Sequence, residues 1–239
     1  MGSKSGSGKE KRKSRYEFRE RYENIELYNI SVMQFVLAFL IGGVVGTILE
    51  TAWTYVTKGA LQWRAGLIFV PIHPIYAIGA LLMTVTLRPL YRLRYRNAAV
   101  FFGAATIGSA FELLASLVQS WVFGSNSWEY SQQPLNFAGR TSLSMAIIWG
   151  TLGLFWMTLA LPRLLELIDS LEQDIANRIA GFGTSLFLAS AILSSAAVIR
   201  WEMRASAHAG TSAIGLLLDT LFPDWIMKLF YPSLRFLAG

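Results

Sequence analysis

The sequence predicts an all-α fold, a polytopic bundle of about five transmembrane helices. Apolar runs of bilayer-spanning length recur along the chain. Its 239 residues are 54% hydrophobic and only 15% charged, which is too apolar for a soluble domain of this size. The uneven placement of lysine and arginine then indicates which helix ends face the cytoplasm.

Each apolar run reaches the ~20 residues that a helix needs to cross about 30 Å of hydrocarbon. The runs lie at 31–57, 67–87, 98–123, 142–161 and 179–199. Together they predict one transmembrane domain at 30–200. The remaining segment, 201–239, holds only a short apolar run broken by prolines. We expect it to lie as an interfacial tail on the outer side of the membrane, and a broken sixth span is the alternative.

Basic residues set the expected orientation. Eight of the 21 lysines and arginines fall between Lys4 and Arg21, and four arginines lie within 88–96. Because positive flanks stay on the cytoplasmic side, we predict a basic cytoplasmic tail at 1–29 and a multi-pass protein of the cell membrane.

Counting spans from this tail gives the sides of the other loops. Segments 58–66 and 124–141 are expected outside, and 162–178 inside as a short surface helix. Five glutamates interleave with the basic residues of the tail and no aromatic stacking platform accompanies them, so anionic lipid is the expected partner and nucleic acid is not.

An internal repeat relates the first and third runs. Gly46 to Glu50 and Gly108 to Glu112 both follow the pattern Gly-x-x-x-Glu, and small residues continue at every fourth position, on one helical face. Each run is followed by an outer loop with one arginine and a return helix. We therefore predict two helix hairpins, 30–88 and 97–162, related by a pseudo-twofold axis. A homodimer is expected if the small-residue faces are not both covered within one chain.

The two glutamates lie where charge is costly. An ionised carboxylate at bilayer depth costs ~2.5 kcal/mol or more unless it is paired or hydrated. Ion pairs with the loop arginines would compensate, but we favour a polar, outward-facing pocket that binds a proton, a cation or a small polar ligand. Its candidate residues are Glu50, Arg64, His73, Tyr76, Glu112, Asn136 and Arg140.

Two irregular segments adjoin these residues. Pro71 and Pro74 interrupt the start of the second span, and a helix resuming at Pro74 would place its N-terminus, which favours negative charge, inside the membrane. The outer loop 128–140 is rich in side-chain donors. It would cap the pocket or anchor at the membrane surface through its aromatic residues.

Other site chemistries are weaker. Glu50, His73 and Glu112 are suitable metal ligands, but no short spacing supports a metal site, and none is predicted. The chain has no cysteine, which excludes disulfides and thiolate chemistry. No catalytic residue and no cofactor are predicted.

A set of residues in these segments resembles the bacterial ABC-transporter type IV permease family. The resemblance covers roughly 33–160 and is most specific over 128–150. The residues that match are Glu50, Arg64, Gly66, Pro71, Pro74, Tyr76, Gly79, Glu112, Trp128, Tyr130, Ser131, Pro134, Asn136, Gly139, Arg140, Trp149 and Gly150. Ala65, Val70, Ala77 and Glu129 depart from the family's usual residues. The resemblance implies a membrane permease and leaves its substrate open.

Three functions follow as hypotheses. The first is a permease or transport-associated subunit; because the chain has no Walker A loop, any ATP drive would come from a partner ATPase docking on 88–96 or 162–178. The second is a membrane enzyme acting on a lipid or lipid-linked substrate, with Glu112 or Glu50 as general base and the loop arginines holding phosphate. The third is a non-catalytic membrane scaffold.

Overall fold

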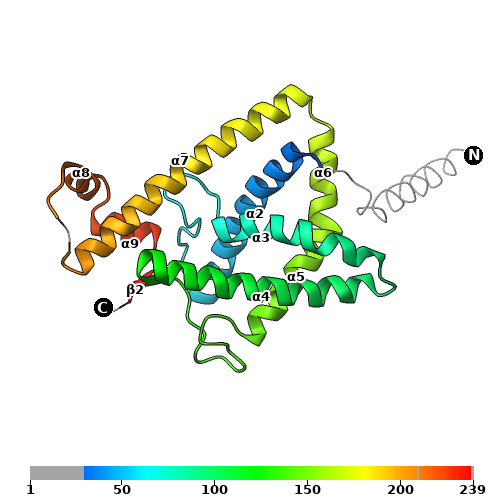
Figure 1. Ribbon diagram of the computed structural model, residues 1–239, viewed down its shortest axis with the longest axis horizontal. Helices are drawn as coiled ribbons and strands as arrows, with labels where there is room; N and C mark the ends of the chain where they lie inside the picture. Colours follow the sequence, from blue (N-terminus) through cyan, green and yellow to red (C-terminus); the bar gives the residue numbers. More distant parts are fainter. Residues whose placement is uncertain (1–29, 209, 238–239) are drawn as a thin grey trace, which may run out of the picture.

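The computed structural model describes residues 30–208 and 210–237, and the predicted basic tail at 1–29 lies outside them. Helices dominate, which confirms the all-α prediction (Figure 1). The elements in chain order are α2 (Val32–Lys58), α3 (Pro74–Leu87), the 3₁₀ helix η2 (Arg88–Arg92), α4 (Arg96–Phe123), β1 (Ser125–Asn126), α5 (Leu143–Phe155), the π-helix η3 (Trp156–Ala160), α6 (Leu161–Asp169), α7 (Gln173–Ala205), α8 (Ala213–Leu221), α9 (Asp224–Phe230) and β2 (Arg235–Phe236).

Four helical stretches of the described chain are long and apolar enough to cross a membrane. They are α2, α4, the continuous run of α5, η3 and α6, and α7. Their boundaries follow local signals. Ser31 and Gln34 form a capping box that starts α2, and glycines in the left-handed conformation, Gly59 and Gly124, end α2 and α4.

The predicted second span is shorter than expected. Only Pro74–Leu87, 14 residues, is α-helical, and the chain from 60 to 73 forms bends without helix. Prolines supply no backbone N–H, and Gly66 turns the chain at φ +73°. His73, which the apolar run at 67–87 places inside this span, is instead the residue that precedes the helix.

The predicted inner surface helix at 162–178 also differs. Residues 161–169 continue the fourth spanning helix through η3, and α7 already begins at Gln173. Pro162 lies inside this continuous helix, directly after the π-helical turn, where the backbone ladder is already irregular and a missing N–H can be accommodated.

Both hairpins of the predicted repeat are present, as the pairs α2–α3 and α4–α5. A Cβ added at Gly46 would lie 2.1 Å from Tyr76 Cβ, and one at Gly108 would lie 2.4 Å from Trp149 Cγ, so both pairs need glycine for their close approach. At these two glycines the small-residue faces are covered inside one chain, and the homodimer stays a prediction.

The C-terminal segment returns to the loop that follows α4 (Figure 1). β2 pairs antiparallel with β1, while α8 and α9 lie against the end of α7. With nine and seven residues, α8 and α9 are each too short to cross a bilayer.

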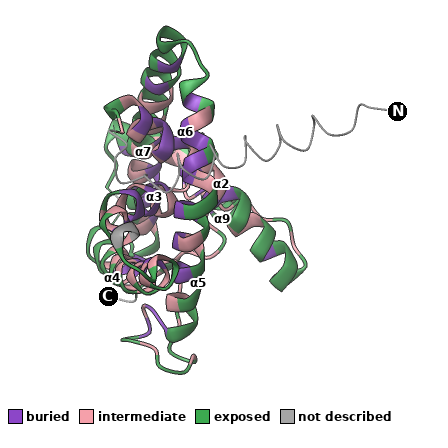
Figure 2. Ribbon diagram, turned by 90° about the vertical axis from the view of Figure 1, so that its right-hand side faces the viewer, coloured by how far each residue is buried: buried purple, intermediate pink, exposed green. Residues whose placement is uncertain are grey.

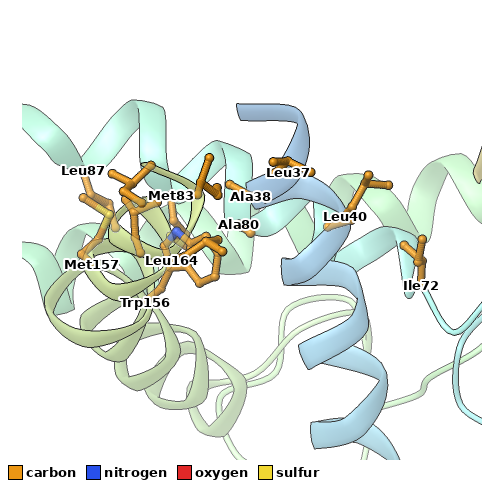
Figure 3. Close-up of a cluster of buried hydrophobic side chains, with 14 of the residues drawn as sticks. Leu37, Ala38, Leu40, Ile72, Ala80, Met83, Leu87, Trp156, Met157 and Leu164 are labelled. Carbon is orange, nitrogen blue, oxygen red and sulfur yellow. The ribbon is translucent and has the colours of Figure 1, made fainter. Parts of the chain in front are cut away.

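Buried apolar side chains form two clusters, and much of the outer surface of the long helices is exposed (Figure 2). The larger cluster lies where α2 and α3 meet the fourth span, with Ala80, Met83 and Trp156 close together (Figure 3). The second cluster holds α9 and the end of α8 on α7 and includes Trp201 and Met227. Large side chains that stay exposed on α4 and α7 are those expected of lipid-facing helices.

Candidate functional site

Glu50 lies on α2 and is held by two partners from the return segment. Arg64 Nη2 donates to Glu50 Oε1 at 2.8 Å, and the Tyr76 hydroxyl donates to Oε2 at 2.9 Å. Arg64 Nη1 also donates to Ser233 Oγ at 2.6 Å, which ties the C-terminal segment to the pair. Because Gly59 ends α2 and Gly66 turns the chain, the loop returns Arg64 to the carboxylate. Glu50 therefore forms an ion pair with a loop arginine, which was the alternative to a ligand-binding pocket.

Glu112, on α4, has a different environment. Tyr130 Oη donates to Oε1 at 3.1 Å and Thr141 Oγ1 donates to Oε2 at 2.8 Å. The residue is only 4% exposed, and within 30–208 and 210–237 it forms no ion pair. Its carboxyl group is buried among neutral donors.

Arg140 is not the partner of Glu112. Its Nη1 donates to Ser116 Oγ and to Ser120 Oγ, each at 2.8 Å, one and two turns beyond Glu112 on the same helix. The two hairpins therefore resemble each other in their glycine contacts and differ in their electrostatics.

Tyr130, which hydrogen-bonds Glu112, is also near enough to Glu50 to interact with its charge. Burial raises the pKa of the Tyr130 phenol most, and the negative charges of Glu112 and Glu50 raise that pKa further, while Arg64 opposes them. A loop tyrosine thus lies within electrostatic reach of both glutamates. We call Glu50, Arg64, Tyr76, Glu112, Tyr130 and Thr141 the carboxylate centre.

Of the two remaining candidates, His73 adjoins the centre and Asn136 lies in the outer loop. The His73 ring is 5.0 Å from the Tyr76 ring, and its buried Nδ1 has no hydrogen-bond partner among the described residues. Asn136 shapes the outer loop: its Nδ2 donates to the carbonyls of Ser131 and Gln133, and its Oδ1 accepts from Gly139 N.

Sequence reasoning did not select several residues in and around the centre. Ser116 and Ser120 stand on the small-residue face of the third run, and their hydroxyls were the available signal. Tyr130 and Trp149 belong to the most specific part of the family resemblance, but nothing local shows that they approach Glu112 and Tyr76. Ser233, 169 positions from Arg64, carries no such signal.

No group of three or more histidine or acidic side chains is placed to hold a metal in the part of the chain that the structure describes. Glu50, His73 and Glu112, the residues of the metal alternative, form no such group there.

An apolar groove adjoins the centre between α2, α3 and the fourth span. It is half open, with about 470 Å³ of empty space that includes the part open to the outside, and of the candidate residues only Tyr76 lines it. Its other lining residues are Gly42, Val45, Gly46, Leu49, Gly79, Ala80, Met83, Trp149, Leu152, Gly153, Phe155 and Trp156.

Long apolar helices around buried charged groups define a multi-pass integral membrane protein. The family model described as "Putative ABC-transporter type IV" matches residues 37–195, which is more than half of the chain. The chain belongs to this family and is a membrane protein associated with transport. No curated protein and no solved structure matches it.

Proposed function

We propose that this chain is a permease or transport-associated subunit whose carboxylate centre binds a small cation or a proton. Glu112 carries the proposal, because a carboxylate buried among neutral donors keeps its negative charge uncompensated, and a cation or a proton would neutralise that charge. Glu50 already has Arg64, so the ligand is expected to interact chiefly with Glu112. The orientation predicted from the basic residues places this centre toward the outside of the cell membrane.

Thermal unfolding of the purified protein tests this function. Sodium, potassium and small alkylammonium ions are titrated at constant ionic strength, and the wild type is compared with Glu112→Gln. At least one cation should raise the wild-type Tm and leave the Tm of Glu112→Gln unchanged. Asp174→Asn, an exposed acidic residue near the start of α7, is the matched control and should keep the response. Equal responses in Glu112→Gln and wild type, or none in wild type at any pH, would contradict the proposal.

The family name supports a second part of the proposal, an ATPase partner on the cytoplasmic face. The arginine-rich segment 88–96 between α3 and α4 is the proposed contact, and Arg94 is exposed there. Affinity purification from gently solubilised membranes should recover a nucleotide-hydrolysing subunit with wild type and lose it with Arg94→Glu. Lys58→Glu, at the C-terminal end of α2 and so on the predicted outer side, should retain the ATPase subunit. Purification of the wild-type chain without an ATPase would count against this partner.

A further inference from the structure

Helix α8 has the reverse of the polarity expected of a helix that lies in water. Its one charged residue, Asp219, faces α7 and pairs there with Arg200 and Arg204. A helix on a water-covered surface instead buries its apolar side and exposes its charged side. In α8 the exposed residues, apart from Thr220, are all aliphatic: Ala213, Ile214, Leu216, Leu217 and Leu221.

The charged contacts of α8 are enclosed between this helix and α7. Arg200 is 7% exposed, and a Cβ added at Gly215 would lie 2.8 Å from its Cζ, so the guanidinium lies directly against the backbone of α8. Arg200 donates to both carboxylate oxygens of Asp219. Arg204 pairs with Asp219 and with Asp224 at the start of α9. The ion pairs therefore hold both short helices on the end of α7 and keep the charges of α8 away from its apolar side.

Helix α9 adds side chains that are typical of a membrane–water boundary. Trp225 and Leu229 are four residues apart, and so on one face of the helix, and are 69% and 61% exposed. Lys228, beside Leu229, is exposed as well. Tryptophan is enriched at the level of the lipid headgroups, and a lysine can extend its amine to the headgroups from an apolar surface.

The position of the two helices makes the bilayer the neighbour of this apolar surface. Both pack on the C-terminal end of α7, which is long enough to cross a membrane. In Figure 1, α8 lies on the side of α7 away from α4. Ile199 and Met203, near the same end of α7, are 40% and 38% exposed, so apolar side chains reach the surface on α7 there too.

From these observations we infer that α8 and α9 are embedded as a pair in the leaflet around the C-terminal end of α7, at the boundary between headgroups and acyl chains. The partner of their exposed side is phospholipid, and the ion pairs with α7 face the protein. Amphipathic helices of this kind insert about 5–10 Å into the boundary. Because Ser233 follows α9 and accepts from Arg64, the insertion would fix to the membrane the segment that contacts the carboxylate centre.

Spin labelling of single cysteines tests the inference, since the natural chain has no cysteine. Full-length Leu217→Cys carries a nitroxide and is reconstituted in vesicles of phosphatidylethanolamine and phosphatidylglycerol. The measured quantity is the ratio of nitroxide collisions with oxygen, which concentrates in lipid, to collisions with a water-soluble nickel chelate. This ratio should be several-fold higher for Leu217→Cys than for the control Thr211→Cys, an exposed position just before the N-cap of α8.

Two further positions complete the comparison. Leu221→Cys, on the same side of α8, should behave as Leu217→Cys does, and Ile192→Cys, 69% exposed on α7, supplies the value of a side chain in lipid. Ratios at 217 and 221 equal to that of Thr211→Cys would place this side in water and overturn the inference. Low collision rates with both reagents would mean that protein, such as a second copy of this chain, covers it, and would overturn the inference equally. Because no cation enters the readout, this inference and the cation proposal can fail independently.

Discussion

At the scale of single residues, the two carboxylates of the centre are stabilised by different means. Glu50 is neutralised by Arg64, with side chains 22% and 17% exposed, whereas the partners that the structure gives Glu112 are neutral: the hydroxyls of Tyr130 and Thr141 and the nearby Trp149 indole. A charged partner fixes one ionisation state, and neutral donors accommodate a carboxyl group in either state. The difference makes Glu50 the structural member of the pair and Glu112 the residue proposed to bind the cation or proton.

The Glu50–Arg64 pair should show strong coupling in a double-mutant cycle. Arg64→Ala leaves a mostly buried carboxylate without its counter-charge and should cost about 3 kcal/mol of stability. Glu50→Gln added to Arg64→Ala should recover part of that loss, because the stranded charge is removed. Chemical denaturation in detergent measures both effects. Strictly additive losses would mean that the pair contributes no interaction energy.

A second residue-scale prediction concerns Asp219 in α8. Its carboxylate accepts from Arg200 Nε at 2.9 Å and Nη2 at 2.6 Å and also pairs with Arg204. These contacts, Arg200 first, lower the pKa of Asp219 from 3.8 to about 2. A lowered pKa contributes stability above the ordinary value, and that stability is lost as the pH falls from about 4 to about 2.

Pepsin digestion across this pH range measures the effect. Cleavage between α7 and α8 should be faster in Asp219→Asn than in wild type near pH 4, and the ratio of the two rates should approach one near pH 2. A ratio that stays constant with pH would show that ionised Asp219 does not hold α8.

At the scale of helices, glycine decides how closely the hairpin helices approach. Gly46 faces the Tyr76 side chain and Gly108 faces the Trp149 ring, and each lies four residues before a glutamate of the centre. Close approach of the backbones brings each return segment within reach of the carboxylate. The repeated Gly-x-x-x-Glu pattern therefore combines a packing position with a functional position.

Replacing these glycines should separate packing from helix propensity. Gly46→Ala and Gly108→Ala force a Cβ to 2.1 and 2.4 Å from ring-bearing side chains and should each cost about 1–3 kcal/mol. Gly181→Ala, on α7 with no atom within 4 Å of the added Cβ, should instead stabilise the helix by up to about 1 kcal/mol. Thermal unfolding of the three variants compares them directly. A Tm for Gly46→Ala at or above that of Gly181→Ala would refute the close-packing account.

At the scale of the whole molecule, contacts between segments that are distant in sequence close each end of the bundle. At one end Gln34 Nε2 donates to Asp169 Oδ1 at 2.7 Å, joining the start of α2 to the end of α6. At the other end β2 pairs with β1, and Ser233 accepts from Arg64. The C-terminal segment therefore belongs to the same end as the carboxylate centre.

Single-cysteine labelling can determine which end faces outward, because the natural chain has no cysteine. In intact cells a membrane-impermeant maleimide should label Gln132→Cys and Thr211→Cys, which share the end of the carboxylate centre. Ser170→Cys, at the turn between α6 and α7, should react only after permeabilisation; all three positions are exposed. Labelling of Ser170→Cys alone in intact cells would reverse the predicted orientation.

The sequence by itself determined the features that depend on composition and local spacing. Apolar runs of spanning length predicted the four long helices, and the prolines indicated where the second run is irregular. Residues four apart lie on one helical face whatever the fold, so the paired Gly-x-x-x-Glu motifs and the unusual depth of Glu50 and Glu112 were also visible. The family could be recognised from its spaced residues.

Only the tertiary structure decided which of these groups meet. Both loop arginines looked equivalent in sequence, yet Arg64 reaches a glutamate and Arg140 binds two serines. Ser233 and Tyr130 join the centre through contacts that depend on how the helices are packed, and the apolar groove consists of space left between three of them. Partner choice and empty volume depend on the relative placement of distant segments, which local periodicity and composition do not encode.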